Sequence, residues 1–336
     1  MTRSSPGTVF RIVLALLVLA ALAWGSTKFD WQLIGHQLGE ASLPAVFGMA
    51  VAWLGALFIR PFRLQVLLRA LAPDIERPYW NIWAADVIAM AINSVLPMRA
   101  GDMMMAFVLR RGETDRTASV FSVVLVDRLF DFATVVIIFV CALSWAPTVE
   151  GWARHLRLML LLVLGGGAIA LWIVVRVRLR LLSWIDRALQ RVAPHRGERW
   201  RVRVHDLFAG IAIVDNPGVF IPVVLLSFVL WGVTATSYWL GMLAIWSPAS
   251  FAAAAFTAGA VALSAIAPVS PGGIGVFHAV VVLALSLFEV PGEPALAIAI
   301  IIHAFQLGSV LVLGGLGLFG QGISVRSLAA LRESRP

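Results

Sequence analysis

The sequence has few residues that could build a covalent or ionic framework. Its 336 residues include one cysteine, Cys141, and one lysine, Lys28, and only 13% of them are charged. A single cysteine excludes an intrachain disulfide framework and every zinc or redox motif that needs several cysteines. The sequence contains no ATP-binding loop of the Gly-x-x-x-x-Gly-Lys type, so a transport step driven by ATP would need another subunit. Metal and cofactor sites are therefore not expected.

Long apolar runs are abundant instead. Hydrophobic residues make up 60% of the chain, and a water-soluble domain of that composition could not cover its own surface. The runs approach the roughly 20 residues that span a bilayer. The composition predicts an all-α polytopic membrane protein, with a single integral membrane domain over 1–336. Spans are expected at 9–25, 42–59, 79–95, 118–145, 157–175, 218–246, 251–267, 273–288 and 294–319.

The first of these spans resembles a signal peptide. Ala21-Leu22-Ala23 follows the apolar run and offers a site for cleavage. Because many spans follow it, we expect an uncleaved first helix.

The basic excess is explained by topology. The 26 basic and 18 acidic residues give an isoelectric point near 11.2, which would indicate nucleic-acid binding in a soluble protein. With the amino terminus in the cytoplasm, 21 basic residues fall inside and three fall outside, as the positive-inside rule requires. The inside residues are Arg3, Arg11, Arg60, Arg63, Arg69, Arg77, Arg110, Arg111, Arg116, the nine arginines from Arg176 to Arg203, Arg326, Arg332 and Arg335. We expect a bacterial inner membrane, both termini in the cytoplasm, and no nucleic-acid partner.

Two spans are interrupted by proline and glycine. Segment 79–109 has basic flanks on both sides and is broken at Pro97 and Gly101, so it should enter from the cytoplasm and return there. Segment 251–288 is broken between Pro268 and Gly275, has no basic flank, and should open from the outside. Both are expected to be re-entrant hairpins.

The two halves then read as an inverted-topology repeat. The first repeat is 42–145 with hairpin 79–109, and the second is 218–319 with hairpin 251–288. In transporters, broken segments at corresponding places in two halves indicate the substrate site.

A basic segment, 176–206, joins the repeats. It carries nine arginines and three acidic residues. It is expected to be either an amphipathic helix on anionic lipid or a loop that only sets orientation.

Polar residues at bilayer depth are functional candidates, and the first group surrounds the first break. Asn93, Arg99 and Asp102 lie there. Arg99 offers a fork of donors that suits phosphate or carboxylate. A structural Arg99–Asp102 ion pair is the alternative.

The second group lies in span 118–145. Asp127 and Asp131 are four residues apart and share a helix face, whereas Arg128 points elsewhere. The carboxylates are expected to bind a cation, share a proton or pair with Arg99. The alternative is a structural Arg128–Asp131 pair.

The second hairpin contributes backbone rather than charge. Gly272, Gly273 and Gly275 leave amide groups uncovered just before a helix begins, which favours anion binding. Close packing is the alternative role of these glycines. His278 follows one turn later and is a candidate for proton coupling or a packing residue.

Three motifs together resemble the flippase-like membrane domain of lysylphosphatidylglycerol synthases. They run from Asn93 to Asp102 (NSVLPMRAGD), from Asp127 to Asp131 (DRLFD) and from Pro268 to His278 (PVSPGGIGVFH), which includes Ser270. The family commonly has glutamate where this chain has Asp102, Asp127 and His278. The resemblance implies movement of a lipid or lipid-linked head group between leaflets, and a chain without the aminoacyl-transferring half.

The residues and the resemblance together predict a transporter or flippase for an anionic lipid, without a covalent step. Asn93, Arg99, Asp102, Ser270 and the three glycines would bind the substrate, while Asp127, Arg128, Asp131 and His278 would balance charge or couple ions. Anionic membrane lipids are the expected partners, and lipid-synthesis enzymes are possible ones. The alternatives are an integral-membrane enzyme acting on lipid head groups and a scaffold for lipid synthesis.

Overall fold

The fold was analysed in a computed structural model. It describes residues 27–73, 75–96, 100–109, 117–147, 212–265 and 270–321, with isolated residues between 155 and 208. Within these ranges every regular element is a helix and none is a strand. The expected all-α class is therefore confirmed for this part of the chain.

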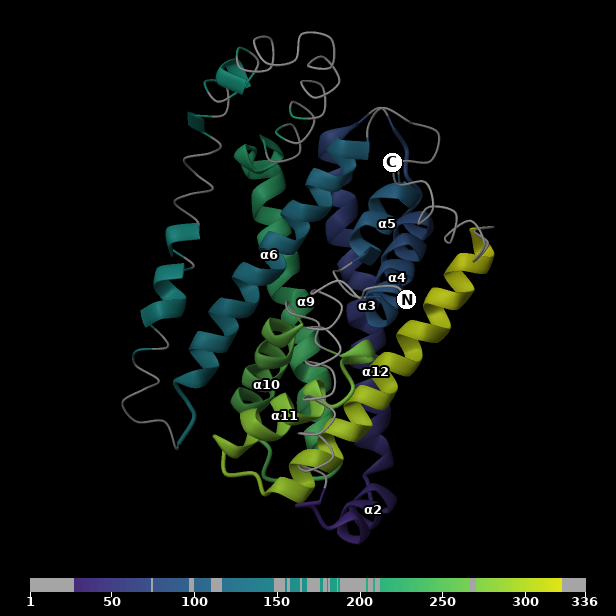
Figure 1. Cartoon of the computed structure of the whole chain (residues 1–336), viewed down its shortest axis with the longest axis vertical. Coiled ribbons are helices and arrows are strands. Elements are labelled where there is room, and N and C mark those ends of the chain that lie inside the picture. Colours follow the sequence, from purple (N-terminus) through teal and green to yellow (C-terminus); the bar gives the residue numbers. More distant parts are fainter. Residues whose placement is uncertain are drawn as a thin grey trace, which may run out of the picture.

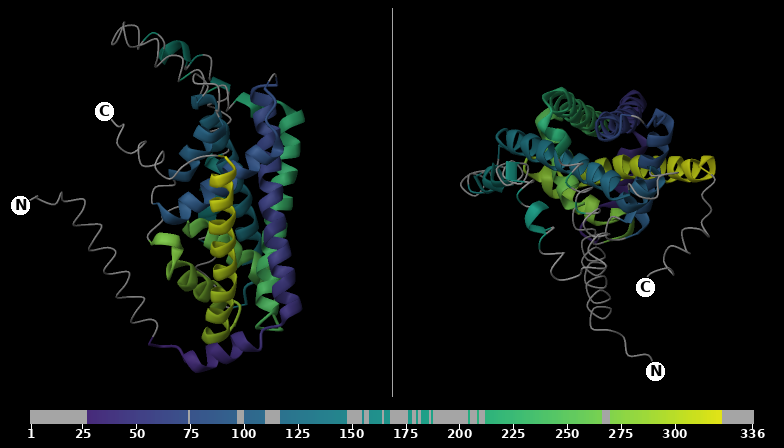
Figure 2. Two further views of the ribbon diagram at one scale, coloured as in Figure 1. Left: turned by 90° about the vertical axis from the view of Figure 1, so that its right-hand side faces the viewer. Right: turned by 90° about the horizontal axis from the view of Figure 1, so that it is seen from above.

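Four long helices form the frame: α3 (Leu43–Leu71), α6 (Thr117–Leu143), α9 (Pro217–Leu243) and α12 (Gly292–Gly320). The helices α3, α9 and α12 are long and apolar enough to cross a membrane. α6 is of similar length but carries three charged residues in its middle. Figures 1 and 2 show α3 and α9 running side by side along the length of the molecule.

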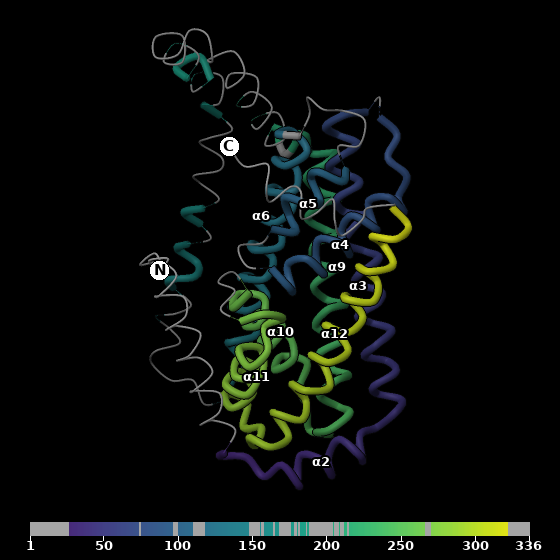
Figure 3. Tube along the Cα trace, turned by 45° about the vertical axis from the view of Figure 1, so that its right-hand side comes forward, coloured from purple at the N-terminus to yellow at the C-terminus, as the bar shows by residue number. Residues whose placement is uncertain are grey.

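Two broken hairpins fill the space beside this frame. The first consists of α4 (Tyr79–Val95) and α5 (Ala100–Leu109). The second consists of α10 (Phe251–Ser264), the 3-10 turn η3 (Pro271–Gly273) and α11 (Val276–Ser286). Figures 1 and 3 show the helices of the two hairpins in opposite halves of the molecule.

Side-chain caps begin several of these helices. Asn216 accepts a hydrogen bond from the amide of Gly218, and Ser250 accepts one from the amide of Ala253. These oxygens satisfy amide groups of the first helical turn. Local sequence thus fixes where α9 and α10 start.

Each hairpin packs against a long helix of the other half. α4 lies against α12, and α10 lies against α6. Small residues permit the second contact: Gly259 approaches Phe139, whose ring stacks on Phe256 at 4.4 Å between centroids. One hydrophobic cluster surrounds the first hairpin and another surrounds the second. Between these two cores, α4 of the first hairpin contacts the η3 turn of the second.

The structure corrects two expected boundaries. α3 continues to Leu71 through Pro61, twelve residues beyond the expected end at 59. Gly101 lies inside α5 rather than at the break. A Cβ at this position would collide with the carbonyl oxygen of Ala89 in α4. Gly101 therefore serves close packing of the two hairpin arms.

Two short elements were not expected. α2 (Trp31–Gly39) lies across one end of the molecule, where Ile34 packs on Leu296 and Ala297 of α12. η2 (Ile213–Asp215) precedes α9. The expected span 9–25, most of span 157–175 and most of the basic segment 176–206 lie outside the described residues.

Candidate functional site

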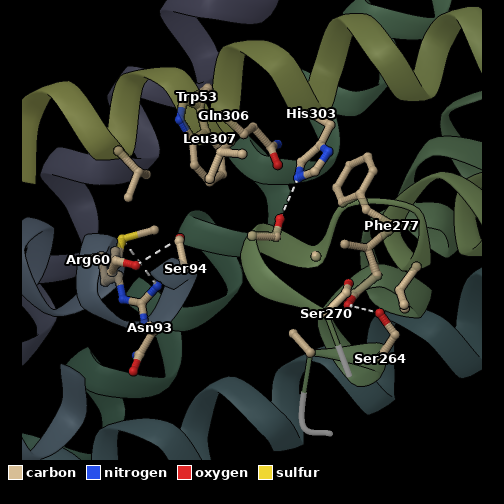
Figure 4. Close-up of a pocket in the computed structure, with 17 residues that line it drawn as sticks. Trp53, Arg60, Asn93, Ser94, Ser264, Ser270, Phe277, His303, Gln306 and Leu307 are labelled. Carbon is tan, nitrogen blue, oxygen red and sulfur yellow. Dashed lines mark hydrogen bonds between the residues drawn. The ribbon is translucent and has the colours of Figure 1, made fainter. Parts of the chain in front are cut away.

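A cavity of about 340 Å³ lies where the two broken hairpins meet. Its walls come from α3, α4, α10, the η3 loop, the start of α11 and α12. Figure 4 shows Arg60, Asn93 and Ser94 on one side and Ser270 and Phe277 on the other, with α12 along the edge. The volume is at the lower end of the roughly 300–1,000 Å³ of small-ligand pockets, so it suits a head group rather than acyl chains.

Arg60 is the one fixed charge among the described residues that line this cavity. Its Nε lies 3.3 Å from Oδ1 of Asp86, and its Nη2 lies 3.7 Å from Oδ2 of Asp131. Within the part of the chain that the structure describes, its Nη1 has only the sulfur of Met90 as hydrogen-bond acceptor, at 3.9 Å. The side chain is 20% exposed. Because these contacts of Arg60 are long, its guanidinium N–H groups can still donate to a ligand in the cavity.

Two further polar atoms in the cavity wall are buried without a hydrogen-bond partner in the described part of the chain. They are Oγ of Ser270 and Nε2 of Gln306, whose side chain interacts with the hydroxyl of Tyr238 without reaching hydrogen-bond geometry. An unpaired buried polar atom costs about 1–3 kcal/mol. A bound ligand with matching groups would recover that cost.

A buried ionic network lies directly behind Arg60. Arg63 is fully buried, with Nε 2.8 Å from Oδ1 of Asp127 and Nη1 2.8 Å from Oδ1 of Asp131. Its Nη1 also donates to Oγ of Ser227 at 2.9 Å. Trp231 of α9 donates to Asp131 at 3.2 Å. The cation that the two carboxylates bind in this structure is therefore an arginine from α3.

Arg128 extends the network to the first hairpin. Its Nε lies 3.3 Å from Oδ1 of Asp102 in α5, and its Nη1 lies 3.2 Å from Oδ2 of Asp131. Its Nη2 reaches Asp86 at 3.7 Å. The Arg128–Asp131 pair that was expected as the structural alternative is therefore present, and it is one of several contacts of Arg128.

Sequence reasoning missed three members of this network. Arg60 and Arg63 were counted with the cytoplasmic arginines because the span was expected to end at residue 59, and Asp86 was not expected to be a site residue. The available signal was the i, i+3 spacing of two arginines around Pro61, which continues the helix face into the core.

Asn93 joins the two arms of the first hairpin. Its Oδ1 accepts from the amide of Gly101 at 2.8 Å, and its Nδ2 donates to Asp102 at 3.3 Å. It therefore caps α5 while lining the cavity. Pro97 and Arg99, which complete this break, lie outside the described residues.

The loop of the second hairpin depends on glycine. Gly272, Gly273 and Gly275 have φ values of 64°, 69° and 84°, which disfavour residues with a Cβ. The amide of Gly273 donates to Ser270 O at 3.1 Å, and the amide of Gly275 donates to Nδ1 of His278 at 3.3 Å. A phosphate would therefore have to displace these bonds to use those two amides.

The histidines stabilise this loop. His278 accepts the Gly275 bond and thereby caps the start of α11. His303 of α12 has Nε2 2.8 Å from the carbonyl oxygen of Gly272 and stacks on Phe277 at 4.4 Å. The two imidazole rings lie 5.0 Å apart. Both histidines thus have packing and hydrogen-bonding roles beside the cavity.

The sequence of this chain matches a known protein family. Residues 9–314 match the family described as the lysylphosphatidylglycerol synthase TM region. This chain belongs to that family. The match includes both broken hairpins and, with the apolar helices, makes the chain a multi-pass membrane protein.

One relative is longer than the part of it that matches this chain. The glycosyltransferase AglD of Haloferax volcanii is 26% identical over 352 residues, covering 95% of this chain and 55% of that protein. The chain therefore spans about half the length of this relative.

Proposed function

We propose that this chain moves an anionic lipid, or a lipid-linked head group, between the two leaflets without a covalent step. The observation that carries the proposal is the cavity between the two hairpins, whose described lining contains Arg60 and no carboxylate. An anionic head group would bind there while the acyl chains stay in the bilayer. Membership of the lysylphosphatidylglycerol synthase TM family supports a function connected with lipids.

An inverted repeat would supply the movement. α3 packs on α9, α4 packs on α12, and α6 packs on α10, so each contact has a counterpart in the other half. We propose that 42–145 and 218–319 are inverted repeats and that 79–109 and 251–288 are re-entrant hairpins from opposite sides. Rocking of one half against the other would then expose the cavity alternately.

Arg60 takes the central position in this mechanism. Its pairs with Asp86 and Asp131 are longer than the 2.8 Å pairs of Arg63, so a phosphate competes more easily for Arg60. Arg99, Gly272 and Gly273 remain proposed contacts of the same head group. Asp102, Asp127, Arg128 and Asp131 would balance the charge as Arg60 changes partner, and His278 would hold the loop.

Reconstitution in liposomes with leaflet-resolved fluorescent lipids tests the proposal. Arg60→Gln should lower the initial rate by at least roughly 10-fold, because a charged hydrogen bond contributes about 1.5–3 kcal/mol. Arg60→Lys should keep part of the rate. Arg69→Gln is the matched control, since Arg69 is exposed at the end of the same helix. Wild-type protein that moves no lipid, or that instead takes up soluble glycerol phosphate, would overturn the proposal.

An enzymatic function is a second candidate because the relative AglD is named a glycosyltransferase. Under this alternative, purified protein would alter lipid head groups in the presence of a glycosyl donor. Mass spectrometry of the extracted lipids measures this directly. Unchanged head-group masses alongside lipid movement would favour the transporter.

A further inference from the structure

The polar lining of the cavity restricts the head group further. We infer that the cavity selects a phosphate head group with neutral hydroxyls, such as a polyol or a sugar, over one with a free amine. This inference rests on the proposed function for its lipid, but it concerns the selectivity of the cavity.

The first step is the absence of negative charge. Among the described lining residues there is no aspartate or glutamate. The residues that continue the two breaks, 97–99 and 266–269, contain none in the sequence either. The carboxylates behind the cavity wall are paired with arginines: Asp127 and Asp131 contact Arg63, and the buried Asp86 lies between Arg60 and Arg128. An ammonium group at bilayer depth needs a counter-charge, and this lining does not supply one.

The second step is the mixture of donors and acceptors. Among the described residues, Oγ of Ser270 has no hydrogen-bond partner, and Nε2 of Gln306 is a donor without a well-formed hydrogen bond, since its side chain has only an interaction with the hydroxyl of Tyr238 that falls short of hydrogen-bond geometry. The hydroxyl protons of Ser94 and Ser264 are donated to the carbonyls of Met90 and Val261, so their oxygens can only accept. A ligand hydroxyl both donates and accepts, whereas an ammonium only donates and cannot accept from Nε2 of Gln306.

The third step is the placement of these groups. Figure 4 shows Arg60 at one side of the cavity, Ser270 at the other and Gln306 on α12 between them. A phosphate bound to Arg60 would thus direct its substituent toward Ser270 and Gln306. Charge recognition and hydroxyl recognition are separated in space, so they can be tested separately.

The experiment compares three lipids in the same proteoliposomes. Phosphatidylglycerol carries phosphate and hydroxyls, phosphatidic acid carries phosphate alone, and phosphatidylethanolamine carries phosphate and an amine. We expect phosphatidylglycerol to move fastest and phosphatidylethanolamine slowest. Ser270→Ala and Gln306→Leu should each lower phosphatidylglycerol movement by roughly 2- to 10-fold, the value of one neutral hydrogen bond, and leave phosphatidic acid unchanged. Ser286→Ala, exposed on α11 away from the cavity, is the control.

A charge substitution gives the complementary test. Gln306→Glu has nearly the same shape but adds a carboxylate, so it should shift the preference toward phosphatidylethanolamine. Equal movement of all three lipids by the wild type, or an unchanged preference in Gln306→Glu, would overturn the inference and leave the proposed lipid movement standing.

Binding keeps the test independent of transport. Dihexanoyl lipids with the same three head groups are added to purified protein in detergent, and the shift of the thermal unfolding midpoint is recorded. Phosphatidylglycerol should give the largest shift, and this difference should disappear in the Ser270→Ala/Gln306→Leu protein. A larger shift with the amine lipid contradicts the inference even if no lipid is moved.

Discussion

Arg63 of α3 and Asp127 of α6 form a fully buried ion pair, with Nε 2.8 Å from Oδ1 and Nη2 donating to the Asp127 carbonyl at 3.2 Å. The two residues are 64 positions apart. Arg60, one turn earlier on the same helix, lines the cavity and has only longer pairs. One helix therefore carries a structural arginine and an arginine available to a ligand.

Arg63→Met should destabilise the protein strongly. Removing one partner of a buried pair leaves an uncompensated charge and costs about 3–5 kcal/mol. The measurement is unfolding in mixed micelles with increasing SDS. Asp127→Asn combined with Arg63→Met should cost less than the sum of the single changes. Equal stability of Arg63→Met and Arg69→Met would contradict the assignment.

Gly101→Ala should destabilise the first hairpin through a steric effect. The added Cβ would collide with the carbonyl of Ala89, and overpacking costs about 1–3 kcal/mol. Gly35→Ala is the matched control, because nothing lies within 4 Å of a Cβ there. The same SDS titration should show no loss, or a small gain, for Gly35→Ala.

Gly273→Ala should cost stability for a different reason. The nearest atom to an added Cβ is 4.0 Å away, but φ is 69°. The backbone conformation alone should cost about 1–2 kcal/mol. Gly273→Asn should lose less, since asparagine tolerates this conformation better. If both variants were as stable as wild type, the loop would not need glycine at this position.

Cysteine labelling tests the predicted orientation. In a Cys141→Ser background, single cysteines replace Glu76, Asp215, Ser247 and Pro291, all exposed and outside the long helices. A membrane-impermeant maleimide added to intact cells should label positions 247 and 291 and spare 76 and 215, because the charge bias places the latter pair in the cytoplasm. Labelling at position 76 without labelling at position 247 would show that the chain has the opposite orientation in the membrane.

The helix pattern followed from sequence because it depends on local properties. The expected spans 79–95, 251–267 and 294–319 correspond to α4, α10 and α12, since apolar runs, prolines and caps act within a few residues of the chain. α3 was expected to be too short because arginines in an apolar helix indicate an end unless distant carboxylates neutralise them. Those carboxylates lie on α4 and α6, far from the arginines in the sequence, so the residues near the arginines do not predict them.

For the site, the sequence determined the participating residue types. Polar residues within apolar segments singled out Asn93, Asp102, Asp127, Arg128 and Asp131, because bilayer depth penalises every unneeded charge. The tertiary structure decided how these residues are paired. It pairs Asp127 and Asp131 with Arg63, makes Asn93 a cap for α5, and places Arg60, Ser270 and Gln306 in the wall of one cavity. Pairing depends on which helices pack together, and that is set by the shapes of the buried surfaces of all the helices at once.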